Sequence, residues 1–144
     1  MNTRRTVRVE VEVPAHLQDE LDQLLVELSA GRRPRMEALS SDRRTIEQRA
    51  SSALAKIVTH IEAHDGTGGA RRLVKFVAGL YNGDDYPFDL TELRGLDVEL
   101  QNACLDYLNY DRLGIDEVHT HLPGGDKQLH RWLARYEITP RESR

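Results

Sequence analysis

The chain has 144 residues, of which 39% are hydrophobic and 31% charged, and its formal net charge is −4 at pH 7. This is a globular composition with room for a single core, and the acidic balance argues against a protein that works mainly by coating nucleic acid. The lone cysteine excludes an intrachain disulfide and a cysteine-cluster metal site. Without a membrane-length apolar run or a signal peptide, we expect a cytoplasmic protein with no membrane partner and no cofactor.

The first predicted element is a β-strand over Thr6–Val13, where valine alternates with polar residues. A lone strand leaves its backbone groups unpaired, so it must pair with a weakly signalled strand elsewhere or with a second copy of itself. Antiparallel pairing of two copies about Val9 sets Arg8 opposite Glu10 of the second copy. We therefore expect a homodimer. The predicted dimerisation residues are Val7, Arg8, Val9, Glu10 and Val11.

An amphipathic helix follows Pro14, with leucines at helical spacing from Leu17 to Leu28 and a stop at Gly31. A strand followed at once by such a helix, V-R-V-E-V-E-V-P-A-H-L-Q-D-E-L-D-Q-L-L, resembles the opening of ribbon-helix-helix DNA-binding proteins. The resemblance covers the first half of that motif. Arg32–Ser41, a basic linker that contains proline, stands in place of the short turn and second helix.

The next helix is expected to start at Ser40 or Ser41 and to run to about His64. Its apolar face is rich in alanine, which predicts a closely approaching neighbour. Arginines and a lysine on its other faces form, with the linker arginines, the basic region of the chain. A solvated helix face explains them, and a patch for nucleic acid or an acidic partner is the alternative.

Glycines at 68 and 69 precede a helix that is apolar nearly all round and is expected to be central. Asp89 is the expected N-cap of a short helix, with Glu92 as the second member of a capping box, and Asp97 caps the next. Cys104 lies in that helix and is expected to be a buried thiol. Asp126 is expected to cap the last helix.

The sequence thus predicts a mainly α protein. Residues 1–31 form a strand–helix arm, residues 32–41 a basic linker, residues 42–138 a helical domain within a total of five or six helices, and residues 139–144 a flexible tail.

The stretch Thr67–Asp97 resembles a family of uncharacterised small proteins from bacterial integrative and conjugative elements, and the resemblance extends weakly to Trp132. It rests on a T-G-x-x-R-R helix start, an aromatic helix that ends in Asn, and F-D-x-T-E-L followed by L-D. These are Thr67, Gly68, Arg71, Arg72, Phe76, Asn82, Phe88, Asp89, Thr91, Glu92, Leu93, Leu96 and Asp97. The resemblance implies a mobile-element context, and it provides no catalytic residues to carry over to this chain.

Four histidines are the weak candidates for metal ligands: His60 and His64, one helical turn apart, and His119 and His121. The pattern H-I-E-A-H is not the zinc motif H-E-x-x-H, because Glu62 points away from the shared face. We therefore assign no metal site.

Two groups of residues remain without a structural role and are the predicted partner-binding residues: Asp84, Asp85 and Tyr86 on an acidic turn, and Arg71 and Arg72 at a helix start. The sequence favours a non-enzymatic macromolecular-interaction protein with a protein partner, and inhibition of a host defence system such as CRISPR is the subclass that the mobile-element context implies. The alternatives are a DNA-binding regulator of ribbon-helix type and a metal-dependent enzyme. Nucleic acid is the less favoured partner.

Overall fold

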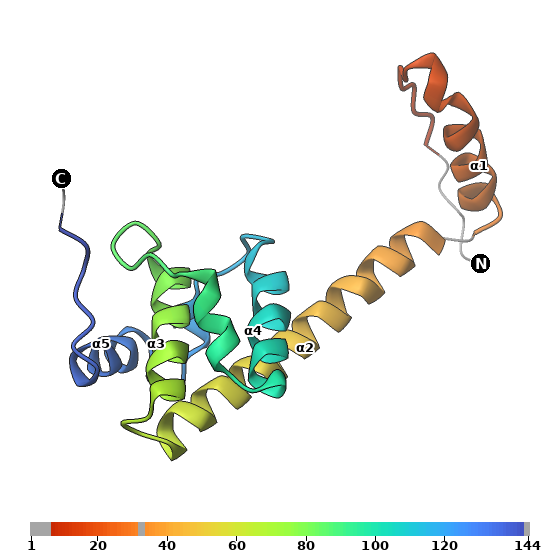
Figure 1. Ribbon diagram of the computed structural model, residues 1–144. Coiled ribbons are helices and arrows are strands. Elements are labelled where there is room, and N and C mark those ends of the chain that lie inside the picture. Colours follow the sequence, from red (N-terminus) through yellow and green to blue (C-terminus); the bar gives the residue numbers. More distant parts are fainter. Residues whose placement is uncertain (1–6, 32–33, 143–144) are drawn as a thin grey trace. The chain divides into compact units, whose positions relative to one another are not determined.

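The computed structural model describes residues 7–31 and 34–142, and the chain divides into two compact units, residues 1–41 and 42–144. The described residues are mainly helical, with no β-strand among them (Figure 1). The predicted mainly α class is therefore confirmed. Within these ranges, no helix combines the length and the apolarity that crossing a membrane requires.

The first unit holds a short 3-10 helix, η1 (Ala15–Leu17), that leads into α1 (Gln18–Ser29). Pro14 precedes η1 with a φ of −55°, which suits a proline at a helix start. Gly31 follows α1 with a φ of +74°, the left-handed conformation that ends helices. The predicted helix and its stop at Gly31 are both confirmed.

The predicted N-terminal strand does not form within the single chain. Residues 7–14 carry no regular secondary structure, and Thr6 lies outside the described residues. The physical reason is that a strand exists only as part of a ladder, and no other described segment forms a strand that could pair with it. Pairing with a second copy stays a prediction.

The helix predicted to begin at Ser40 or Ser41 begins earlier, because α2 spans Pro34–Ala63. Residues 34–41 of the predicted linker are therefore helical, while Arg32 and Arg33 lie outside the described residues. Proline fits the first helical position, where its missing N–H removes no helical hydrogen bond. In the second unit α2 buries five residues of its predicted apolar face, which are Ala50, Ala53, Leu54, Ile57 and Ile61.

The second unit also contains α3 (Gly68–Tyr81), which was predicted to be central. The elements that follow it are η2 (Leu90–Gly95), α4 (Val98–Asp111), η3 (Val118–His121) and α5 (Gly125–Arg135). Six α3 residues are buried, and the helix contacts α5, η2 and η3 (Figure 1). The buried side chains of α2, α3, α4, η3 and α5 form one core.

Most predicted helix starts are confirmed. Asp97 Oδ1 accepts from the Leu100 N–H at 2.9 Å, and Asp89 Oδ1 accepts from the Thr91 N–H at 2.8 Å. The Thr67 hydroxyl accepts from the Ala70 N–H at 3.2 Å and so caps α3.

Two details of the predicted caps are wrong. Glu92 does not complete a capping box with Asp89, because its carboxylate pairs with two cations of α3 instead. Asp126 does not cap α5, which has Gly124 at its N-cap. Gln128 takes that role from inside the helix, with Oε1 accepting from the Gly124 N–H at 3.0 Å.

Candidate functional site

The two predicted partner-binding arginines are engaged within the chain. Arg71 donates from Nη1 to the Tyr136 carbonyl at the end of α5. Arg72 Nε lies 3.2 Å from Glu92 Oε2, and Lys75 Nζ lies 3.0 Å from Glu92 Oε1. Both arginines thus fasten α3 to neighbouring elements.

The acidic turn is organised by Asn82. Its Oδ1 accepts from the N–H groups of Asp84 and Asp85, each at 3.1 Å, and its Nδ2 donates to Asp85 Oδ2 at 2.9 Å. The Asp85 carbonyl also accepts from the Arg141 N–H at 2.7 Å. Tyr86 is half-buried against the core. Within the described ranges, Asp84 is the exposed carboxylate of this turn that has no side-chain partner.

The four candidate histidines have other contacts. The rings of His60 and His64 stack with centroids 4.2 Å apart, and His119 packs edge-on against Tyr81. His121 Nε2 lies 3.5 Å from Asp116. The part of the chain that the structure describes holds no group of three or more His, Cys, Asp or Glu side chains placed to bind a metal.

Sequence reasoning missed the carboxylates that bind α5 to the end of α2. Glu62 Oε1 accepts from Trp132 Nε1 at 3.0 Å and from Gln128 Nε2 at 3.3 Å. Arg135 donates hydrogen bonds to the Asp65 carboxylate from both Nε and Nη2. The Arg135 hydrogen bond holds the pKa of Asp65 below its usual value. This contact therefore stabilises the fold at pH values above the usual pKa of an aspartate. The stabilisation is lost when the pH falls far enough to protonate Asp65 in the folded protein.

Cys104 is fully buried in α4, as predicted, and burial raises the pKa of its thiol to about 12. A thiol in this state is a poor nucleophile and a poor metal ligand at neutral pH. It is a packing residue of the core.

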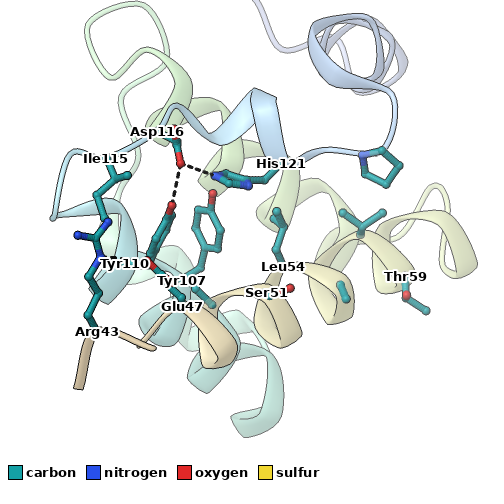
Figure 2. Close-up of a pocket in the computed structure, with 14 residues that line it drawn as sticks. Arg43, Glu47, Ser51, Leu54, Thr59, Tyr107, Tyr110, Ile115, Asp116 and His121 are labelled. Atoms are coloured by element: carbon teal, nitrogen blue, oxygen red, sulfur yellow. Dashed lines mark hydrogen bonds and ion pairs between the residues drawn. The ribbon is translucent and has the colours of Figure 1, made fainter. Parts of the chain in front are cut away.

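A cleft of about 740 Å³ lies between α2 and the segment from α4 to η3 (Figure 2). The charged side chains of Arg43, Glu47 and Asp116 lie at one end of it, and Thr59 lies at the other (Figure 2). The lining consists of Arg43, Glu47, Ala50, Ser51, Leu54, Ala55, Val58, Thr59, Tyr107, Tyr110, Ile115, Asp116, His121 and Pro123.

Asp116 is the centre of the polar end. Its Oδ2 accepts from the Tyr110 hydroxyl at 3.0 Å and lies 3.5 Å from His121 Nε2 (Figure 2). Burial, followed by the hydrogen bond to Asp116, raises the pKa of Tyr110. Arg43 and Glu47 pair across one helical turn, with Nε and Oε1 3.0 Å apart, so their charges cancel locally.

Tyr107 is 2% exposed, and its buried hydroxyl has no hydrogen-bond partner in the described part of the chain. Figure 2 shows the Tyr107 ring beside Tyr110, with its hydroxyl turned to the same side as His121. Leaving a buried hydroxyl unpaired costs about 1–3 kcal/mol. Burial raises the pKa of this phenol, and the charges of Asp111 and Asp116 add to the shift. The hydroxyl therefore stays protonated, and in the free chain it is enclosed by protein atoms.

Among the residues that line this cleft, the sequence singled out only His121 as a candidate ligand, and the expected ligand role was toward a metal. The signal that could have led to the cleft was the alanine-rich face of α2, which was interpreted as a site of close helix approach. Ala50 and Ala53 of that face are buried, as close approach requires, and the small side chains of Ser51 and Ala55 beside it line the cleft.

No curated protein and no solved structure matches the chain. A family model matches residues 51–137, which include most of the core and all of the cleft except Arg43, Glu47 and Ala50. The mobile-element and ribbon-helix-helix resemblances stay predictions. The chain belongs to DUF7673, a family of unknown function.

Proposed function

We propose that this protein is a non-enzymatic macromolecular-interaction protein that assembles as a homodimer through residues 7–31. The observation that carries the proposal is the exposure of the apolar side chains of this segment. Val7, Val9 and Val11 are 77%, 73% and 64% exposed. Helix α1 buries none of its residues, although its leucines lie at helical spacing.

Covering these side chains favours association. Burying one valine or leucine side chain is worth about 1.5–3 kcal/mol, so a few of them offset much of the free energy lost on association. The alternating pattern also supplies its own complement. When two copies pair antiparallel about Val9, their valines share one face and Arg8 of each copy faces Glu10 of the other.

The molar mass in solution tests this assembly. We expect sedimentation at micromolar concentration to give twice the 16.4 kDa mass of the chain. Val9→Asp puts a charge in the centre of the pairing and is expected to give a monomer. Leu90→Asp is the matched control, because Leu90 is 72% exposed but lies in the second unit. A monomeric wild-type chain, or equal effects of the two variants, contradicts the proposal.

We propose that the dimer binds a further protein partner. Four of the five predicted partner-binding residues have intrachain contacts that occupy them, which leaves the carboxylate of Asp84 as the group available to a basic partner. Inhibition of a host defence system is the subclass that follows from the mobile-element resemblance. Recovery of no stable partner from a host lysate counts against it.

A DNA-binding regulator is the second candidate, and the order of helices favours it. Because α1 ends at Ser29 and α2 begins at Pro34, an alternating segment is followed by two helices with a short connection. This restores the second helix that the ribbon-helix-helix resemblance lacked. Against it, Glu10 and Glu12 share the outward face with Arg8 and repel phosphates. Duplex binding that falls steeply with salt and is lost in Arg8→Ala but not in Arg131→Ala supports this candidate, and no binding at low salt removes it.

A further inference from the structure

The cleft between α2 and the segment from α4 to η3 has the dimensions of a small-molecule site. Its volume of about 740 Å³ lies within the roughly 300–1,000 Å³ that is typical of such sites. One wall is the face of α2 that carries Leu54 and Val58, and the opposite wall carries Tyr107 and Tyr110. An apolar body therefore fits against Leu54 and Val58, while the charged groups at one end select the head group.

The Tyr107 hydroxyl is the first of these polar groups. It is buried and unpaired, whereas buried hydroxyl groups in native proteins almost always have a partner. A ligand atom at the polar end of the cleft is a natural partner, after a small shift of the ring. The hydroxyl oxygen can accept a hydrogen bond as well as donate one, so the surrounding charge decides which kind of head group is favoured.

That charge is negative. Asp116 uses Oδ2 for both Tyr110 and His121, and its other oxygen has no hydrogen bond within the residues that the structure covers. Arg43 is neutralised by Glu47. The charges of Asp111 and Asp116 also act on Tyr107, since both raise the pKa of its phenol. An anion at this position is repelled, and a cation is attracted.

We propose that the cleft binds a small organic cation, with its ammonium group between Asp116 and the Tyr107 hydroxyl and its apolar body against Leu54 and Val58. His121 is the competing group, because its protonated ring would neutralise Asp116 from 3.5 Å. This site is independent of the dimer proposed above and lies wholly within residues 43–123.

A titration of the full chain with three probes of matched size tests the charge preference. The probes are 2-phenylethylammonium, 2-phenylethanol and 3-phenylpropanoate, followed by amide chemical shifts in NMR spectra. We expect the cation to bind about tenfold tighter than the alcohol, the anion to bind weakest, and the shifts to map to residues of α2 and α4 that line the cleft. This tenfold difference is what one charge-assisted hydrogen bond provides.

Two variants test the named groups. Asp116→Asn is expected to weaken the cation about tenfold and to leave the alcohol unchanged. Tyr107→Phe is expected to weaken the cation severalfold while the urea midpoint stays the same or rises, because the hydroxyl makes no bond in the free protein. Asp84→Asn is the control, since it removes an exposed carboxylate that does not line the cleft.

The proposal is overturned by equal binding of all three probes, by tightest binding of the anion, or by cation binding that survives both variants. Absence of shifts in the cleft at millimolar cation has the same meaning. The NMR spectrum of each variant reports its folding directly, so a misfolded Asp116→Asn protein leaves Tyr107→Phe to decide the question.

Discussion

At the scale of single residues, one carboxylate oxygen of α2 receives three contacts from α5. Oε1 of Glu62 lies 3.0 Å from Trp132 Nε1, 3.3 Å from Gln128 Nε2 and 3.5 Å from Arg131 Nη2. Trp132 is 4% exposed, so its indole N–H depends on this acceptor. The interaction joins residues 70 positions apart in the sequence.

Glu62→Ala is expected to lower the free energy of unfolding by about 1–2 kcal/mol, because it leaves a buried indole N–H without an acceptor. Glu62→Gln keeps an acceptor oxygen and is expected to cost less. Urea denaturation followed by circular dichroism measures both. Glu99→Ala is the matched control, since Glu99 pairs with Lys56 in an exposed contact of 3.2 Å and such pairs contribute at most about 1 kcal/mol. Equal losses for Glu62→Ala and Glu99→Ala would contradict the assigned role.

Residue roles were predictable where the partner is close in sequence. Asp97 and Asp89 cap helices through N–H groups three and two residues ahead, and the local pattern is enough to predict this. Glu92 was assigned a local cap, but its partners Arg72 and Lys75 come from α3. Only the assembled fold brings these groups together, so spacing along the chain could not reveal them.

At the scale of elements, α3 and the segment that follows it are packed as closely as van der Waals contact allows. A Cβ built on Gly79 would lie 3.0 Å from the Phe88 Cβ and 3.3 Å from the Tyr86 carbonyl oxygen. Phe88 in turn packs edge-on against Phe76, with ring centroids 5.6 Å apart. Glycine at this position therefore lets the chain fold back onto its own helix.

Gly79→Ala sets two effects against each other. Alanine improves helix propensity by about 1 kcal/mol, but overpacking against backbone atoms costs about 1–3 kcal/mol. We expect a net loss of stability of about 1 kcal/mol, measured as a lower urea midpoint. Gly69→Ala is the control in the same helix, because its Cβ meets only His60 Nε2 at an ordinary 3.4 Å, and it is expected to be neutral or stabilising. A stabilising Gly79→Ala would show that the Phe88 segment moves aside freely.

The periodicity of apolar residues predicted the helices well, because a helix satisfies its own backbone and needs only one buried face. It predicted the start of α2 poorly, since the proline and arginines before Ser40 suggested a linker. The strand is the reverse case. Alternation predicts which side chains share a face, but the partner that makes a strand is not encoded in the segment itself.

At the scale of the whole molecule, every buried residue that the structure describes lies between residues 50 and 136. The fragment 42–144 is therefore expected to fold without the first unit. It should retain helical circular dichroism and a cooperative urea transition with a midpoint close to that of the full chain, and it should be monomeric if residues 7–31 form the dimer. A fragment with no cooperative transition contradicts this expectation.

The cleft forms only when several elements pack together, which explains why the sequence did not predict it. Ser51, Tyr107 and His121 come from three elements, and no spacing rule relates them. The sequence gives no sign of the unpaired Tyr107 hydroxyl, because the missing partner becomes visible only when the neighbours of Tyr107 are in place.

Trp132 is the only tryptophan of the chain, and it lies at the contact between α5 and Glu62. The molecule therefore carries a built-in optical reporter for this one contact. Release of α5 moves the indole into water and shifts its fluorescence emission to the red, while the helical signal of the other elements can persist. The gap between the two signals on heating measures whether the C-terminal helix opens before the rest of the core.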